Sequence, residues 1–311
     1  MPTIDQHPGA LSTKVLVVGD SGTGKTGAIA SLIVADYSCF VLDFDNGTEI
    51  LRDYLTNPES PYVKKANGKN LAKMLDYVPL SDTMTNINGN IVCSKSLAWQ
   101  RATSLLVRWR YWQTTEGKVV WDIKDKDATE KGLILVDHGK VIDWGPDKVI
   151  VVDSLSFAAT AALNYHLSLT GRLAASRTQN EARRDVGATQ AILRKLLELI
   201  YDDSIRCNVI VNSHITEVTD SGYGPNAEEA KDERDTAKGY PSAIGRALSP
   251  IIPRFFNSVL HMEMRGKRMY LMTQPVGNVL TKTAVPLRVK REYPIENALA
   301  DYFADARKGS K

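Results

Sequence analysis

The chain has 311 residues, a net charge of +3 and 43% hydrophobic residues, the proportions of an ordinary soluble globular protein. Its small net charge excludes an overall field that attracts polyanions, so any nucleic-acid-binding surface must be a local patch. The three cysteines, Cys39, Cys93 and Cys207, form no CxxC pair, which argues against a thiolate zinc site and a disulfide framework.

Residues 1–13 form a polar leader without the basic stretch and apolar run of a signal peptide. No segment approaches the roughly 20 apolar residues of a membrane span. We therefore expect a cytoplasmic protein with no membrane contact.

The residues after the leader predict the start of a parallel α/β sheet. An apolar run (14–18, KVLVV) is followed by a glycine-rich loop, a helical pattern (27–37, GAIASLIVADY) and a second apolar run that ends in acids (39–45, CFVLDFD). Strand, loop, helix and strand in this order are typical of α/β proteins.

Further elements extend this pattern. Apolar runs at 77–80 (weak), 148–154 (KVIVVDS) and 208–214 (NVIVNSH) predict more buried parallel strands. Apolar residues at helical spacing predict long helices over 96–112 and about 180–201. We expect an α/β fold with a mostly parallel central sheet flanked by helices.

Two segments interrupt the pattern. Residues 119–144 predict an inserted β-hairpin or small meander. Residues 216–240 have no apolar period and predict a long mobile loop. A β-rich part follows, with a hairpin that turns at 265–267. We expect a core over 14–283 and a C-terminal tail with a helix over 284–311.

The strongest motif matches GxxxxGK[ST] and lies between a predicted strand and a predicted helix. Its backbone N–H groups and the helix N-terminus favour phosphate, so it predicts ATP binding. We expect Lys25 to face solvent in the empty loop and to act on the β- and γ-phosphates, while Thr26 binds Mg²⁺. An ordinary glycine turn is the alternative. The predicted nucleotide-binding residues are Gly19, Asp20, Ser21, Gly22, Thr23, Gly24, Lys25 and Thr26.

Acids follow two predicted strands, where α/β sheets bind their ligands. Asp153 ends the run 148–153 and is predicted to hold Mg²⁺ through water; capping of the next helix is the alternative. Ser154, not glutamate, follows it, so the base that orients the attacking water must lie elsewhere. Asp45 is the preferred base, with Asp43 as its competitor, and both acids could instead cap the helix that begins near Thr48.

His214 follows the run 208–213 and is expected to contact the γ-phosphate and to report the nucleotide state. A purely structural histidine is the alternative.

Together these motifs resemble the RecA-type ATPase core, over about residues 14–283. The segments DFDNGTE (43–49) and GYPSAIGRALSPIIPRFFN (239–257) resemble a group of phage-encoded RecA-like ATPases implicated in single-strand annealing and recombination. This resemblance implies an ATPase in the host cytoplasm that uses Mg²⁺ and binds single-stranded DNA as a ring or filament of identical subunits. A single-strand-binding or replication protein is a further implied partner.

The resemblance also implies residue roles. Asp45 matches the catalytic glutamate of the family, and His214 matches its γ-phosphate-sensing glutamine. The segment 172–195 corresponds to the first DNA loop. Residues 216–240 match the mobile DNA-binding loop, but their seven acids and three bases make a poor phosphate ligand.

Basic residues on either side of that loop are candidates for a nucleic-acid surface, although solvated helix faces and subunit contacts explain them equally well. The candidate DNA contacts are Arg172, Arg177, Arg183, Arg184, Arg265, Lys267 and Arg268. Cations that could complete the site of a neighbouring subunit are Lys238, Arg246 and Arg254.

Three functions remain open from the sequence. The leading one is a DNA-stimulated ATPase in recombination or annealing. The second is an ATP-gated loader or regulator of a replication protein that hydrolyses slowly. The third is a small-molecule phosphotransferase, which the absence of a short arginine-rich lid disfavours.

Overall fold

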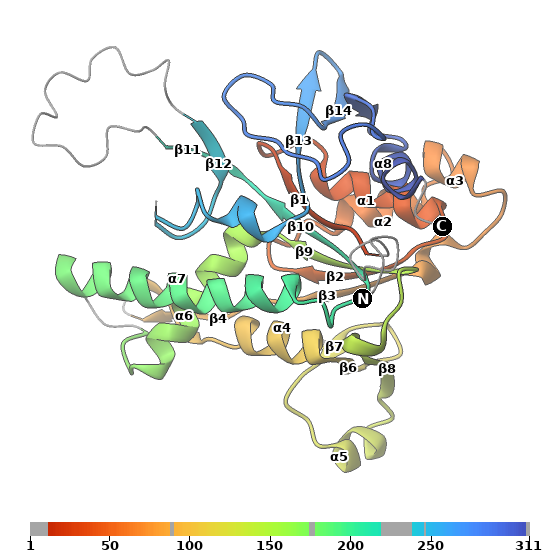
Figure 1. Cartoon of the computed structure of the whole chain (residues 1–311). Helices are drawn as coiled ribbons and strands as arrows, with labels where there is room; N and C mark the ends of the chain where they lie inside the picture. Colours follow the sequence, from red (N-terminus) through yellow and green to blue (C-terminus); the bar gives the residue numbers. More distant parts are fainter. Residues whose placement is uncertain (1–11, 88–89, 174–177, 219–237, 246, 309–311) are drawn as a thin grey trace, which may run out of the picture.

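A computed structural model describes residues 12–87, 90–173, 178–218, 238–245 and 247–308. It has a mixed α/β architecture with one eight-stranded sheet of order β15-β14-β13-β1-β10-β9-β2-β3 (Figure 1). The six strands from β3 to β13 run parallel, and β14 and β15 add antiparallel. The strands are β1 (Lys14–Val18), β2 (Ser38–Asp43), β3 (Leu75–Pro79), β9 (Lys148–Asp153), β10 (Asn208–Ser213), β13 (Ser258–Arg265), β14 (Arg268–Met272) and β15 (Glu292–Pro294).

Helices cover both faces of this sheet, which confirms the predicted mostly parallel sheet flanked by helices (Figure 1). One face packs α4 (Ala98–Val107), α6 (Leu155–Leu169) and α7 (Gln179–Tyr201). The other packs α1 (Lys25–Val34), α2 (Glu49–Thr56), α3 (Pro61–Lys65) and α8 (Ala298–Arg307). Short 3₁₀ helices are η3 (Leu71–Met74), η4 (Val141–Asp143) and η6 (Ile252–Phe255).

Strand β1 shows why the apolar runs form buried strands. Its side chains alternate between the two faces, so Leu16 and Val18 enter one core while Val15 and Val17 enter the other. All four are at most 1% exposed, because both faces are covered by helices. A strand buried on both sides must be apolar throughout.

The predicted helix over 96–112 is too long. Helix α4 ends at Val107, and the next residues form strand β6 (Arg108–Gln113). The sequence RWRYWQ alternates in burial, with Trp109 and Tyr111 buried between more exposed arginines. A period of two favours a strand over a helix.

The predicted hairpin over 119–144 is wrong in its pairing. Strands β7 (Val119–Val120) and β8 (Ile134–Lys140) each pair with β6, and together they form a three-stranded sheet with β6 at its centre. Helix α5 (Asp125–Glu130) lies between β7 and β8 in the chain. We call residues 108–143 the insert.

The segment expected to be a mobile loop begins and ends as strands. Strands β11 (Ile215–Val218) and β12 (Lys238–Pro241) form an antiparallel ribbon, and residues 219–237 lie outside the described residues. A second ribbon, β4 (Thr83–Ile87) with β5 (Asn90–Lys95), was not expected. Most of the predicted leader also lies outside the described residues. No helix in the described ranges has the length and apolar composition that a membrane crossing requires.

The C-terminal elements belong to the main sheet and its core. Strands β13 and β14 form the expected hairpin, and β15 extends the sheet beside β14. The expected C-terminal helix is α8, which packs against α1. Tyr302 and Phe303 are fully buried there.

Candidate functional site

The glycine-rich loop (residues 19–26) connects the end of β1 to the start of α1. The neighbours of β1 are β10 and β13, and β10 lies between β1 and β9. The loop therefore opens at the edge where the parallel strands end. Gly22 and Gly24 have φ angles of 79° and 89°, a region that L-residues with side chains rarely adopt. The backbone can thus turn tightly and begin α1 at Lys25 with no side-chain cap.

Lys25 is folded back into the loop. Its Nζ donates hydrogen bonds to the carbonyls of Gly19 at 2.8 Å and Asp20 at 2.7 Å, and the residue is 7% exposed. The expectation that this lysine faces solvent is therefore wrong. Burial lowers the pKa of Lys25, and the nearby Asp153 and Asp20 partly oppose this.

Asp153 connects the loop to two neighbouring strands. The Thr26 hydroxyl donates to Asp153 Oδ2 at 2.6 Å, and the Asn212 amide donates to Asp153 Oδ1 at 3.1 Å. Asp153 is 2% exposed, and burial together with the charge of Asp45 raises its pKa to about 6. Both carboxylate oxygens of Asp153 thus accept from Thr26 and Asn212, and the N-cap of α6 is Ser154, which makes no side-chain cap bond.

The two acids after β2 have different environments. Asp43 is buried and accepts hydrogen bonds from the Thr48 hydroxyl and from Gly47 N at 3.2 Å, so it holds the turn that starts α2. Burial raises the pKa of Asp43. Asp45 is partly exposed and accepts from Gly47 N at 3.1 Å.

Asp45 also lies beside the Thr26 hydroxyl. A Cβ added to Gly47 would lie 2.9 Å from Asp45 Oδ1 and 3.7 Å from Thr26 Oγ1. Asp45 is thus near the glycine-rich loop, whereas Asp43 holds the turn before α2, whose N-cap Thr48 has no side-chain cap bond.

His214 follows β10 at the same edge of the sheet. Its backbone N donates to Ser156 Oγ at 3.2 Å, and its carbonyl accepts from Ser242 N at 2.7 Å. The ring packs edge-to-face on Phe157, with centroids 6.3 Å apart. Burial lowers the pKa of His214, and the charge of Lys25 lowers it further.

Two residues near the loop were not assigned a role from the sequence. Asn212 orients Asp153, as described above. His261 lies beside Val18 in the β1–β13 register, is 8% exposed, and its Nδ1 has no hydrogen-bond partner among the described residues. In the sequence Asn212 is one of three polar residues at a strand end, but its contact with Asp153 and the position of His261 both depend on which strands are neighbours.

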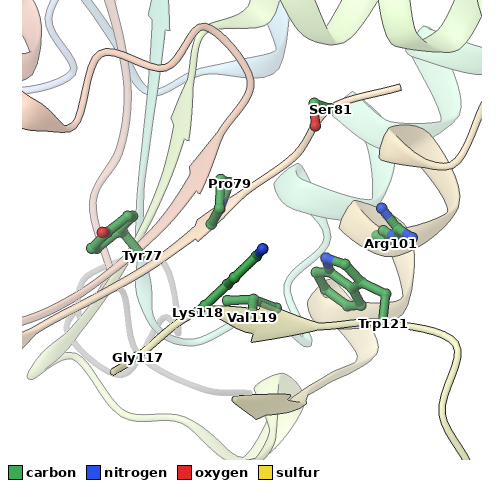
Figure 2. A pocket seen from close by; sticks show the side chains of 8 residues that line it. All are labelled: Tyr77, Pro79, Ser81, Arg101, Gly117, Lys118, Val119 and Trp121. Atoms are coloured by element: carbon green, nitrogen blue, oxygen red, sulfur yellow. The ribbon is translucent and has the colours of Figure 1, made fainter. Parts of the chain in front are cut away.

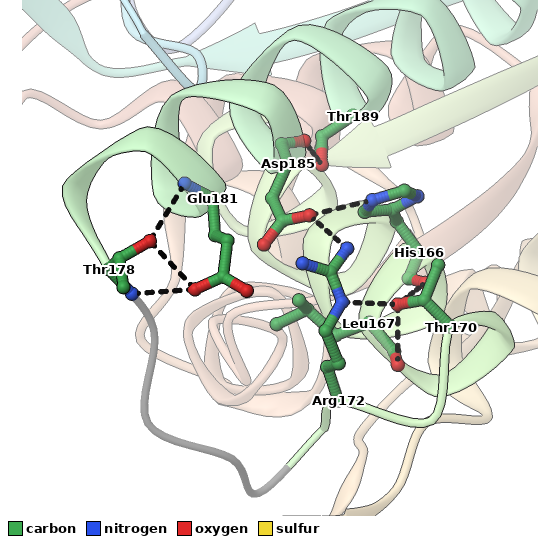
Figure 3. A network of polar contacts seen from close by, with 8 residues as sticks. All are labelled: His166, Leu167, Thr170, Arg172, Thr178, Glu181, Asp185 and Thr189. Carbon is green, nitrogen blue, oxygen red and sulfur yellow. Dashed lines mark hydrogen bonds and ion pairs between the residues drawn. The ribbon is translucent and has the colours of Figure 1, made fainter.

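Two of the predicted DNA contacts are engaged in ion pairs. Arg172 donates to the buried Asp185 at 2.6 Å, and His166 Nε2 lies 3.0 Å from the same oxygen (Figure 3). Arg265 pairs with Glu263 and Glu292, each at 2.7 Å. Both arginines therefore have structural partners.

The remaining candidate cations lie on separate elements. Arg183 and Arg184 are exposed on α7, which covers one sheet face, while Lys267 and Arg268 are exposed on the β13–β14 hairpin. The structure does not gather them into one patch. Among the proposed trans cations Lys238 and Arg254 are exposed. Arg177 and Arg246 lie outside the described residues.

No family model matches the chain, and no curated protein matches its sequence. The site must therefore be interpreted from its own chemistry. It combines a helix N-terminus, one buried ammonium, a hydroxyl bonded to a carboxylate and a second acid beside them. Such a set can bind an anion, hold a hard cation and orient a water molecule.

Proposed function

We propose that the protein is a P-loop NTPase with a RecA-like core that binds ATP and hydrolyses it with Mg²⁺. The observation that carries the proposal is the 2.6 Å hydrogen bond between Thr26 and Asp153 directly after the Lys25 loop. The Lys25 ammonium donates hydrogen bonds to two carbonyls of the loop. In the ATP complex, phosphate oxygens would replace these carbonyls as its acceptors. Its lowered pKa reflects burial that a polyanion would compensate.

The residues present fit a magnesium ion. Thr26 Oγ1 and the Asp153 carboxylate are hard oxygen donors, and Mg²⁺ commonly uses one or two protein ligands together with water and substrate phosphates. The described residues contain no group of three or more His, Cys, Asp or Glu arranged for a metal, and this mode does not require one. When bound, the ion would neutralise charge that develops on the phosphate oxygens.

Two side chains have the chemistry for the hydrolytic step. Asp45 is a partly exposed carboxylate next to Thr26, suited to orient the attacking water. Burial and the charge of Lys25 lower the pKa of His214, which favours the neutral imidazole, and its one N–H could donate a hydrogen bond to a phosphate oxygen. Both assignments agree with the roles implied by the RecA resemblance.

The biological role that we propose is recombination or annealing of single-stranded DNA by a homo-oligomer, as in the phage-encoded RecA-like ATPases. Its support is the resemblance of residues 43–49 and 239–257 to that group, together with the exposed arginines on α7. Since Arg172 and Arg265 are held by carboxylates, the DNA contact does not rest on them.

ATP turnover measured with and without single-stranded DNA tests this proposal. We expect turnover that DNA stimulates and that Lys25→Ala abolishes, with Lys64→Ala as the control. Lys64 is an exposed lysine paired only on the surface with Glu59. Turnover by Lys25→Ala at the parental rate would refute the ATPase. Turnover without any response to DNA would instead favour the loader or regulator, and a phosphorylated small-molecule product would indicate a phosphotransferase.

A further inference from the structure

A groove runs between the free edge strand β3 of the main sheet and the insert. One cavity of about 550 Å³ is lined by Arg52, Lys73 and Tyr111 among others. A second, of about 360 Å³, is lined by Lys118 and Trp121 among others (Figure 2). Tyr77 and Gly117 line both cavities, so the two adjoin at these residues. Their volumes lie in the range of small-molecule ligand sites, roughly 300–1,000 Å³.

Aromatic rings line this groove. Tyr77 on β3 is 46% exposed although it belongs to the main sheet. Trp121 follows β7, and its ring is covered by the Arg101 guanidinium at 4.9 Å, which Asp122 holds at 2.9 Å. Figure 2 shows the Lys118 side chain reaching into the space between Pro79 and Trp121. The groove thus offers flat rings beside a flexible cation.

The charge of the groove is positive on balance. Its cations Arg52, Lys73 and Lys118 are exposed. Asp76, the acid in its wall, already accepts hydrogen bonds from Trp109 at 3.0 Å and from Tyr111 at 2.6 Å.

His138 also lies 2.9 Å from Asp76. These three contacts occupy both oxygens of the Asp76 carboxylate. Glu116 is the remaining acid of the larger cavity, and it is exposed at the rim.

We propose that single-stranded nucleic acid binds in this groove, with its phosphates on Lys73 and Lys118 and a base stacked on the exposed ring of Tyr77. A positive channel with aromatic platforms is the combination that binds single strands without sequence preference. In a duplex the bases are stacked on each other and cannot occupy such cavities. This inference rests on the proposed function, for which it names the nucleic-acid site.

The groove is close in structure to the acids of the glycine-rich-loop site. Pro79 of β3 pairs with Asp43 of β2, and Leu80 N donates to the Asp43 carbonyl at 2.7 Å. Arg52 lies on α2, the helix that starts after the Asp45 turn. A strand bound in the groove therefore contacts the elements that hold Asp43 and Asp45, a direct route for DNA to stimulate hydrolysis.

Fluorescence anisotropy of a labelled oligo(dT), measured at low salt and along a salt series, tests the groove. We expect Tyr77→Ala to lower affinity by roughly five- to a hundredfold. We expect Lys118→Glu to lower it and to make its salt dependence shallower. Tyr77→Phe should bind as the wild type does, because the ring remains.

Two further variants serve as comparisons. Lys126→Glu makes the same charge change on α5 of the insert, away from the groove lining, and should retain affinity. The double variant Arg183→Ala/Arg184→Ala removes the cations that the sequence favoured. Thermal melting identifies variants that fail to fold. If Tyr77→Ala unfolds, Lys118→Glu still tests the groove, because its substituted side chain is exposed.

Each outcome has a definite meaning. If the groove variants bind oligo(dT) as the wild type does, or if only the double arginine variant loses affinity, the groove is not the site and the proposed ATPase still stands. If the wild type binds no oligo(dT) at low salt, the groove inference is overturned, whereas ATP turnover by the same sample decides the ATPase separately. Affinity lost only in the groove variants supports the inference.

Discussion

The hydroxyl of Thr26 donates a 2.6 Å hydrogen bond to the carboxylate of Asp153, joining the first turn of α1 to the end of β9. The two residues are 127 positions apart, and β10 lies between their strands in the sheet. Asn212 on β10 fixes the second oxygen of Asp153. The carboxylate is therefore positioned before any ligand arrives, at the carboxyl edge where α/β sheets bind their ligands.

Asp153→Asn should lower Mg²⁺-dependent ATP hydrolysis by about a hundredfold or more, because an anionic metal ligand is lost while the shape is kept. Nucleotide affinity without Mg²⁺ should change little. Isothermal titration with and without Mg²⁺ measures this difference. Equal losses of affinity in both conditions would assign Asp153 to phosphate binding or folding instead of to the ion.

We expect Asp45 and Asp43, the two acids after β2, to have different roles, one in turnover and one in stability. Asp45→Asn should slow turnover without weakening ATP binding, as expected for a residue that orients water. Asp43→Ala should lower the free energy of unfolding by about 1–3 kcal/mol, because the Thr48 hydroxyl and Gly47 N lose a buried acceptor. Single-turnover kinetics and urea denaturation of both variants provide the test. Normal kinetics for Asp45→Asn would move the base to another residue.

The sequence predicted that Thr26 and Asp153 act at one site, and the structure brings them into hydrogen-bond contact. They could be singled out because the buried strands before them appear as continuous apolar runs and because the glycine-rich motif and the acid at a strand end are local patterns. Asn212 and His261 escaped assignment because their roles depend on strand order, which no local pattern specifies. The burial of Lys25 was also missed, since only the folded loop brings two carbonyls to its ammonium.

The insert shows the limit of periodicity. The helical pattern of residues 98–107 continues into RWRYWQ without a glycine or proline to stop it, so the helix was extended too far. The aromatic alternation in β6 was the available signal. Local sequence does not specify that β6 pairs with β7 on one side and β8 on the other. That pairing depends on tertiary packing, in which Trp109 and Tyr111 are buried in the core.

Arg172 should act on stability more than on DNA. It pairs with Asp185, which is fully buried on α7 and also contacts His166 (Figure 3). Removing Arg172 leaves the buried carboxylate of Asp185 without this ion pair, so Arg172→Ala should destabilise the fold by on the order of 3 kcal/mol. Arg184→Ala, at an exposed position on the same helix, should stay within about 0.5 kcal/mol. Urea denaturation at one pH compares them, and equal stability of all three proteins would contradict the assignment.

His261 should make stability depend on pH. Burial lowers its pKa below the ordinary value, so the unfolded chain binds more protons than the folded one as the pH falls below about 6.5. Stability from this group is therefore complete above that pH and is lost toward acid. Charged groups that act on it are Glu263, Asp20, Arg265 and Lys25.

His261→Gln removes this titration and keeps a polar side chain. The difference in unfolding free energy between the wild type and His261→Gln should shift in favour of the wild type as the pH rises from 5 to 7. Comparing the two proteins at each pH cancels contributions from other groups, such as Asp153. A difference that stays constant across this range would show that His261 has an ordinary pKa.

His214 should couple the nucleotide state to DNA affinity. Its backbone joins both strands of the β11–β12 ribbon, because Ile215 begins β11 and Ser242, after β12, donates to the His214 carbonyl. A hydrogen bond that the ring gains only with a γ-phosphate can therefore change the position of the ribbon. We expect the wild type to bind oligo(dT) about tenfold more tightly with a slowly hydrolysed ATP analogue than with ADP.

The variant His214→Ala should bind both nucleotides but have one DNA affinity in the two states. The substitution leaves the backbone contacts to Ser156 and Ser242 in place, so the ribbon keeps its anchor and loses only the ring. Phe157→Leu is the matched control, since it removes the edge-to-face contact without touching the imidazole. Anisotropy titrations in each nucleotide state measure the ratio. If His214→Ala keeps the wild-type ratio, the γ-phosphate signal reaches the DNA site by another route, such as α2 and the turn that holds Asp45.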